Sequence, residues 1–74
     1  MITMFPVESS MIKAIGHDPI NNILVVKFVR GQVYSYEGVN AKVFQELKWA
    51  ESCGKYFHEK IEKNYKTIKA GGIK

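Results

Sequence analysis

Three apolar-rich runs in the first half of the chain have the pattern of β-strands. Residues 10–16 alternate loosely between apolar and polar, residues 23–29 are rich in β-branched and aromatic residues, and residues 33–36 form the third run. Turn-forming residues at 17–22 separate the first two runs, and an Arg-Gly pair at 30–31 separates the second from the third. The glycine of that pair can adopt the left-handed backbone conformation of a tight hairpin. The pattern therefore predicts three short strands in an antiparallel meander.

The second half of the chain follows the period of a helix. Asn40 is a suitable N-cap residue for a first helix, and Ser52 is suitable for a second. The apolar stripe of the first helix consists of Val43, Phe44, Leu47 and Ala50. One face of the second helix consists of Phe57, Ile61, Asn64 and Ile68, and its other face is charged and mostly basic. We therefore expect an α+β fold, a three-stranded antiparallel β-meander followed by two α-helices packed on one face.

The length and composition of the chain indicate one small domain. Its 74 residues, 46% of them hydrophobic, can form a single core. We expect residues 1–6 to form an N-terminal arm, residues 7–69 to form the domain, and residues 70–74 to form a flexible tail. No run approaches the roughly 20 apolar residues of a membrane span, and residues 1–6 have no features of a secretory signal. The single cysteine excludes an internal disulfide, and these features favour a cytoplasmic protein without a membrane partner.

Catalytic and metal chemistry have little support in the sequence. His17 and His58 lack the spacing of a zinc-binding pair, and the chain contains neither a CxxC nor an HxxxH motif. Cys53 precedes Gly54 and Lys55 at the start of an expected helix, where the helix dipole could lower the pKa of its thiol. The alternative is a small residue that fits a tight turn. No nucleophile, base and orienting group can be assembled, so we expect no enzyme activity, no cofactor and no metal.

Tyr34 and Tyr36 lie on one face of the third expected strand, because successive side chains of a strand point to opposite faces. Two hairpin registers place them differently. If the Arg-Gly pair forms a two-residue loop, Lys27 lies opposite Tyr34, and the two rings form an exposed platform for stacked bases. If Gly31 occupies the bulge position of a three-residue loop, both tyrosines join Phe28 under the helices. The core position is favoured, because a short chain needs its aromatic residues for stability.

Net charge gives a weak indication of the partner. The chain carries 11 lysine and arginine residues against 7 aspartate and glutamate residues, for a formal net charge of +4. This excess favours a polyanionic partner, although many proteins carry a similar excess for solubility alone. We therefore expect a non-catalytic binding module that contacts RNA or another nucleic acid. The candidate nucleic-acid-binding residues are Lys13, Lys27, Arg30, Tyr34, Tyr36, Lys55, Lys63 and Lys66.

Trp49 indicates a second candidate function. On a helical wheel it lies away from the apolar stripe of the first expected helix, and exposed tryptophans often anchor interfaces. The alternative is that the N-terminal segment Met4-Phe5-Pro6 folds over it. The second candidate is accordingly a protein interaction module that uses Trp49 and Phe5, for example a phage or bacterial inhibitor or adaptor, or a homo-oligomer.

Five segments between residue 7 and about residue 65 form a family-like pattern. They are Val7-Glu8-Ser9-Ser10-Met11-Ile12, Gly16 to Pro19, Phe28 with Gly31, Tyr34-Ser35-Tyr36, and Ser52-Cys53-Gly54-Lys55-Tyr56-Phe57. The pattern resembles the KTSC domain, a module named for its occurrence at the C-terminus of some lysyl-tRNA synthetases and also found as a stand-alone bacterial or phage protein. The resemblance implies RNA binding, with RNA favoured over DNA, as the activity suggested for a family whose role is regarded as unknown. Two positions depart from the pattern, His17 where tyrosine is usual and His58 where asparagine is usual.

Overall fold

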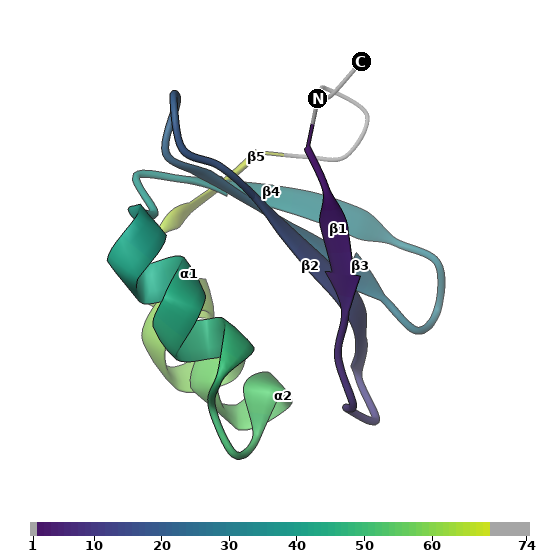
Figure 1. Cartoon of the computed structure of the whole chain (residues 1–74). Helices are drawn as coiled ribbons and strands as arrows, with labels where there is room; N and C mark the ends of the chain where they lie inside the picture. Colours follow the sequence, from purple (N-terminus) through teal and green to yellow (C-terminus); the bar gives the residue numbers. More distant parts are fainter. Residues whose placement is uncertain (1, 69–74) are drawn as a thin grey trace.

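The protein, in a computed structural model that describes residues 2–68, is a five-stranded sheet with its helices on one face (Figure 1). The strands are β1 (Met4–Pro6), β2 (Ile12–Asp18), β3 (Ile23–Phe28), β4 (Val33–Glu37) and β5 (Lys66–Ile68). They are adjacent in chain order, and every neighbouring pair is antiparallel. The helical segments are α1 (Ala41–Lys48), α2 (Cys53–Tyr56) and η1 (Phe57–Glu62), a π-helix that follows α2 directly. The expected α+β class is confirmed.

Strands β2, β3 and β4 form the meander that the sequence predicts. The turn between β2 and β3 is closed by the Asp18 carboxylate, which accepts hydrogen bonds from the Ile20 amide (3.0 Å) and the Asn21 side chain (2.9 Å). Asn22 follows with a φ of 55°, in the left-handed region that asparagine tolerates better than most residues. Asp18 therefore stabilises the turn through its hydrogen bonds, and Asn22 does so by adopting the backbone conformation that the turn requires.

The expected number of three strands is too low, because β1 and β5 extend the sheet at its two edges. β1 lies within the segment 1–6 that we expected to be an arm. Its Pro6 is tolerated because an edge strand needs no hydrogen-bond donor on its open side. Ile2 and Met4 occupy the space left by Gly16, where an added Cβ would lie 2.7 Å from Ile2 Cγ2 and 2.6 Å from Met4 Sδ. The tail expected at residues 70–74 lies outside the described residues.

Helix α1 and the continuous segment formed by α2 and η1 both follow their predicted N-cap residues, Asn40 and Ser52. The Asn40 side-chain oxygen accepts a hydrogen bond from the Val43 amide (3.0 Å), and the Ser52 hydroxyl accepts one from the Lys55 amide (3.3 Å). Each bond satisfies one of the amide groups that the start of a helix leaves without a backbone partner. These two predictions rest on local chemistry alone and are confirmed.

The second helical segment ends earlier than predicted, at Glu62, whereas the predicted helix included Ile68. The Asn64 side-chain amide donates to two carbonyls of the last turn, at 3.4 and 3.0 Å, and so supports this end of the helix. Ile68 lies in β5 and pairs with Ser35, so the prediction that it belongs to the apolar face of a helix is wrong. No helix within residues 2–68 has the length and apolar character needed to cross a membrane.

The core lies between the helices and the face of the sheet that they cover. Phe44 and Leu47 contribute the stripe of α1, as predicted, and Phe57 and Ile61 contribute from η1. The other members are Ile12, Ile15, Leu24, Val26, Tyr36, Val39 and Cys53. Burying one such large apolar side chain stabilises a protein by roughly 1.5–3 kcal/mol relative to an exposed position.

The face of the sheet opposite the helices also contains buried residues. Val25 and Ser35 pair across β3 and β4, and their side chains alternate with the core-facing residues of those strands. They are only 7% and 2% exposed. The Ser35 hydroxyl is buried and has no hydrogen-bond partner among the described residues.

Candidate nucleic-acid interface at the hairpin end of the sheet

The turn between β3 and β4 is a three-residue loop with Gly31 at its last position. The Phe28 amide donates to the Gln32 carbonyl (2.8 Å), and the Gly31 amide donates to the Phe28 carbonyl (2.9 Å). Gly31 has a φ of 99°, a conformation that favours glycine because it has no Cβ. This is the bulged alternative of the two registers compatible with the sequence.

This register places the tyrosine pair on the face covered by the helices. Tyr34 pairs with Val26 and Tyr36 pairs with Leu24, while Lys27 pairs with Val33. Because Leu24 and Val26 belong to the core, the side chains of Tyr34 and Tyr36 point toward the helices as well. The two-residue loop, with Lys27 opposite Tyr34, is wrong.

The two tyrosines differ in burial. Tyr36 is 2% exposed and packs edge-on against Phe57, with ring centroids 5.3 Å apart, and burial raises the pKa of its hydroxyl. It cannot stack on a base in this fold, so the exposed platform of two tyrosines is wrong. Tyr34 is half-buried and meets Phe28 in a T-shaped contact at 5.6 Å. Tyr34 therefore keeps ring surface available at the edge of this aromatic cluster, as does Phe28.

Tyr34 lines a cavity of about 530 Å³ between the hairpin, the loop before β2 and the end of η1, which we call the hairpin cavity. Its apolar lining comes from Met11, Phe28 and Val29, and its polar lining comes from Ser10, Arg30, Gln32 and Glu62. The volume falls in the range of roughly 300 to 1,000 Å³ that is common for ligand pockets. In Figure 1 the turn between β3 and β4 lies away from α1.

Three of the predicted basic residues lie at this end of the sheet. Arg30 is exposed in the hairpin loop, and Lys27 is half-buried in β3, on the face opposite the helices. The register between β2 and β3 shifts from Ile12 opposite Phe28 to Ala14 opposite Lys27, so Lys13 is the extra residue of a bulge. Lys13 is exposed. Because β2 pairs with β3, Lys13 lies beside the strand that carries Lys27.

The other predicted lysines are distributed over the molecule. Lys66 pairs with Glu37 at the opposite end of β4 from the hairpin, so it does not join this group. Lys63 follows Glu62 at the C-terminal end of η1. Lys55, in α2, lines a separate hollow of about 270 Å³ that shares Ser10 and Met11 with the hairpin cavity. The predicted set is thus partly assembled, around Arg30 and Tyr34.

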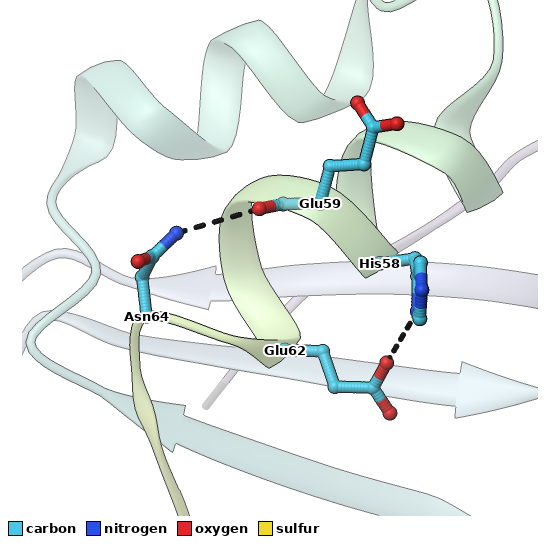
Figure 2. Close-up of polar contacts among 4 residues, drawn as sticks. All are labelled: His58, Glu59, Glu62 and Asn64. Atoms are coloured by element: carbon cyan, nitrogen blue, oxygen red, sulfur yellow. Dashed lines mark hydrogen bonds and ion pairs between the residues drawn. The ribbon is translucent and has the colours of Figure 1, made fainter.

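The sequence did not indicate the role of Glu62 in the hairpin cavity. It belonged to the charged face of the expected helix, and Met11 and Gln32 were likewise not predicted as site residues. Figure 2 shows Glu62 beside His58, whose Nδ1 donates to Glu62 Oε1 at 2.7 Å. The spacing of four residues within a helix is the one signal that could have predicted this pair. The cavity itself depends on tertiary packing.

Comparison with known proteins identifies the family. The sequence model of the KTSC domain matches residues 8–65. The chain belongs to the KTSC domain family. It is 38% identical over 65 residues to a protein of Tsukamurella paurometabola, a match that covers 88% of this chain and 97% of the relative. A KTSC domain protein of Yersinia pestis superposes with a TM-score of 0.86 at 34% identity, over 93% of this chain and 97% of that chain.

Part of a much longer relative matches the same KTSC domain. A lysine–tRNA ligase of Nostoc sp. is 39% identical over 59 residues, which are 80% of this chain and 10% of the ligase. A second such ligase, from Trichormus variabilis, is 37% identical over the same length.

Two segments that carry the KTSC resemblance meet at the hollow beside Lys55. Ser9 and Ser10 lie there with Cys53 and Gly54, and an added Cβ on Gly54 would lie 3.2 Å from Ser9 Oγ. Cys53 is 5% exposed, and burial raises the pKa of its thiol, so the environment opposes the reactive thiolate. Residues 2–68 contain no group of three or more His, Cys, Asp or Glu side chains that could hold a metal. The expectation that this KTSC domain is not an enzyme stays a prediction.

His17, the first departure from the KTSC pattern, has a structural role. Its Nε2 donates to the Val39 carbonyl at 2.6 Å, and its ring stacks on Phe44 at 5.2 Å. These contacts tie β2 to the start of α1.

Trp49 and Phe5, the candidate protein interface, lie on the same side of this KTSC domain. Trp49 is 76% exposed, so the alternative in which the N-terminal segment covers it is wrong. That segment instead forms β1, and Phe5 is 36% exposed at its centre. Lys48 lies between the two, with its Nζ 4.0 Å from the Phe5 ring centroid and 5.8 Å from that of Trp49.

Proposed function

We propose that this KTSC domain binds single-stranded nucleic acid, RNA in preference to DNA, at the hairpin end of its sheet. The observation that carries the proposal is the position of Arg30 and Tyr34 around one cavity, with Lys13 and Lys27 on the adjoining strands. In this arrangement the basic side chains contact phosphates, and the cavity receives a base.

Known physics of single-strand recognition supports this division of roles. Proteins that bind single strands combine a positively charged surface for the backbone with aromatic rings for the bases. Here Tyr34 supplies the accessible ring, and it is held at a fixed angle by its contact with Phe28. Arg30 can contact a phosphate through the planar fork of its guanidinium, whose N–H donors match phosphate oxygens.

The preference for RNA is supported by two relatives. Both are named lysine–tRNA ligases, enzymes whose name specifies an RNA substrate, and each contains a segment similar to this chain. We extend this association with RNA to the present domain as part of the proposal.

Salt dependence tests the proposal. Affinity for a fluorescently labelled, uridine-rich RNA is measured by anisotropy at several salt concentrations. For single strands, each phosphate contact contributes a slope of about −0.7 in log affinity against log salt. The triple variant Lys13→Ala, Lys27→Ala and Arg30→Ala is therefore expected to bind more weakly and with a flatter slope, and the DNA of the same sequence to bind more weakly than the RNA.

Lys42→Ala is the matched control, because Lys42 is exposed on α1, away from the hairpin. It is expected to keep the wild-type slope. Binding that is insensitive to salt, or equal losses in the triple variant and in Lys42→Ala, would contradict the proposal.

The exposure of Trp49 favours a second candidate function, a protein interaction module. An exposed tryptophan beside Phe5 and Lys48 combines the aromatic and cationic groups that are enriched at interface hot spots. Trp49→Ala is expected to abolish self-association or partner binding without a large loss of stability. If the wild-type protein is monomeric and captures no protein that Trp49→Ala fails to capture, this second function is excluded.

A further inference from the structure

We infer that the hairpin cavity accepts one unpaired guanine and that the Glu62 carboxylate binds its Watson–Crick edge. This inference rests on the proposed function and specifies the base that the site selects. It starts from a feature that charge alone does not explain, namely an acidic side chain, Glu62, in the wall of a cavity that Arg30 also lines.

The cavity has the form of a base-binding site. The edge of Phe28, the half-buried ring of Tyr34 and the exposed side chain of Met11 give it an apolar interior. Such surfaces favour the flat faces of a base over the hydrated phosphate backbone. Arg30 lies at the loop, where a phosphate attached to a bound nucleotide can remain in solvent.

Glu62 is oriented by its neighbour. His58 Nδ1 donates to Oε1 at 2.7 Å, and both residues lie on the same side of η1 (Figure 2). The described residues supply no hydrogen bond to Oε2, and the side chain is 51% exposed. A carboxylate has about four lone-pair positions, so Oε1 can accept a second hydrogen bond while Oε2 accepts its first.

Guanine matches this pair of acceptors better than the other bases. Its N1–H and its 2-amino group are adjacent donors that point in the same direction, and both can bond to one carboxylate. Adenine and cytosine present an amino group next to an unprotonated ring nitrogen, which would face the carboxylate with a lone pair. Uracil presents one N–H between two carbonyl oxygens. Hydrogen bonds to a charged acceptor are about twice as strong as neutral ones, so this edge dominates selection.

The local backbone supports a binding role for Glu62. It is the last residue of a π-helix, a rare conformation that is frequent at functional sites. The Asn64 side-chain amide donates to the carbonyls of Glu59 and Lys60 and so supports this end of the helix. Glu62 therefore lines the cavity from a well-defined helix end.

Short RNAs that differ at one base test the inference. Each contains a central guanine, inosine, adenine, cytosine or uracil between flanking uridines, and its dissociation constant is measured at a low and at a high salt concentration. A good bidentate contact provides about 1–3 kcal/mol of discrimination, so we expect the guanine RNA to bind about tenfold more tightly than the uracil RNA. Inosine keeps N1–H and lacks the 2-amino group, so its affinity should fall between the two.

The Glu62→Gln variant should lose the preference for guanine over uracil. Glu59→Gln is the matched control, since Figure 2 shows Glu59 directed away from Glu62 on the same helix. It should keep the preference. Circular dichroism of both variants checks that the fold is retained, and the inosine comparison needs no variant.

Two outcomes separate this inference from the proposed function. Equal, salt-dependent affinity for all five RNAs, or a guanine preference that survives in Glu62→Gln, would overturn the guanine site and leave nucleic-acid binding intact. Failure of every RNA to bind in a salt-dependent manner would overturn the proposed function and the guanine site with it.

Discussion

Val26 lies directly opposite Tyr34 in the ladder between β3 and β4. This pairing places the Tyr34 ring on the face that the helices cover, because side chains opposite one another in an antiparallel ladder share a face. A slip of one residue would move Tyr34 and Tyr36 together to the other face. The extra residue in the Gly31 loop therefore fixes which aromatic rings form the core and which ring remains available at the cavity.

Replacing Tyr36 tests its place in the core. Tyr36→Ala removes a ring that is 2% exposed and packed on Phe57, so we expect a loss of about 3 kcal/mol or more in the free energy of unfolding. Urea unfolding measures the loss. Tyr36→Phe, which keeps the ring, should retain most of the stability. If Tyr36→Ala lowers the free energy of unfolding by less than about 1 kcal/mol, the ring does not lie in the core.

Ser35→Ala is expected to stabilise the protein. The Ser35 hydroxyl is buried and has no hydrogen-bond partner within residues 2–68, and leaving a buried polar group unsatisfied costs about 1–3 kcal/mol. Its removal should raise the midpoint of thermal unfolding. The matched control is Ser9→Ala, since the Ser9 hydroxyl accepts hydrogen bonds from the amides of Met11 and Ile12 and its loss should lower the midpoint. A lower midpoint for Ser35→Ala would show that its hydroxyl is satisfied.

Gly16→Ala is expected to displace β1 from the sheet. The added Cβ would lie 2.6 Å from Met4 Sδ and 2.9 Å from the Thr3 carbonyl oxygen, too close for either to remain in place. Amide hydrogen exchange should show loss of protection in β1 while β3 stays protected. In Gly31→Ala, where nothing lies within 4 Å, the positive φ alone is strained, so β1 should remain protected. Full protection of β1 in Gly16→Ala would contradict this packing.

Tyr56 should give the protein a specific sensitivity to alkaline pH. Burial, together with the hydrogen bond that its hydroxyl donates to Glu46 Oε1 at 2.7 Å, raises the pKa of Tyr56 to about 12 from a usual value of 10.0. As the pH rises, the Tyr56 hydroxyl therefore loses its proton at a lower pH in the unfolded chain than in the folded protein. The contribution of the protonated hydroxyl to stability is fully present below pH 10, and it is lost as the pH rises through about 12.

The measurement for Tyr56 is the denaturant midpoint as a function of pH for the wild type and Tyr56→Phe. The wild type should lose more stability than the variant between pH 10 and about 12, because the variant has no hydroxyl to ionise. Parallel curves for the two proteins would mean that Tyr56 has the same pKa in the folded and unfolded states.

Features with strong local determinants could be predicted from the sequence. The three central strands follow from the β-branched residues 23–29 and their flanking turns, and the helix starts follow from the hydrogen-bonding capacity of Asn40 and Ser52. The family resemblance, carried by segments along most of the chain, is confirmed by the match over residues 8–65.

The features that were missed depend on partners distant in sequence. β1 and β5 are three residues long, too short for a recognisable period, and exist because β2 and β4 offer free edges. Ile68 has helical spacing relative to Ile61 by chance, and no local sequence feature distinguishes a position on a helix face from its actual position in β5. The hairpin cavity combines Met11, Tyr34 and Glu62 from three separate segments, so no motif could specify it.

The most direct test of nucleic-acid binding at the hairpin end is a titration of the isotope-labelled protein with a short single-stranded RNA, followed by two-dimensional amide NMR. We expect the largest chemical-shift changes at residues 10–13 and 27–34, around Arg30 and Tyr34, and we expect these changes to diminish at high salt. Residues 41–49, which comprise α1 and its C-cap residue Trp49, should change little. Shifts centred on Trp49, or no shifts at low salt, would contradict the account.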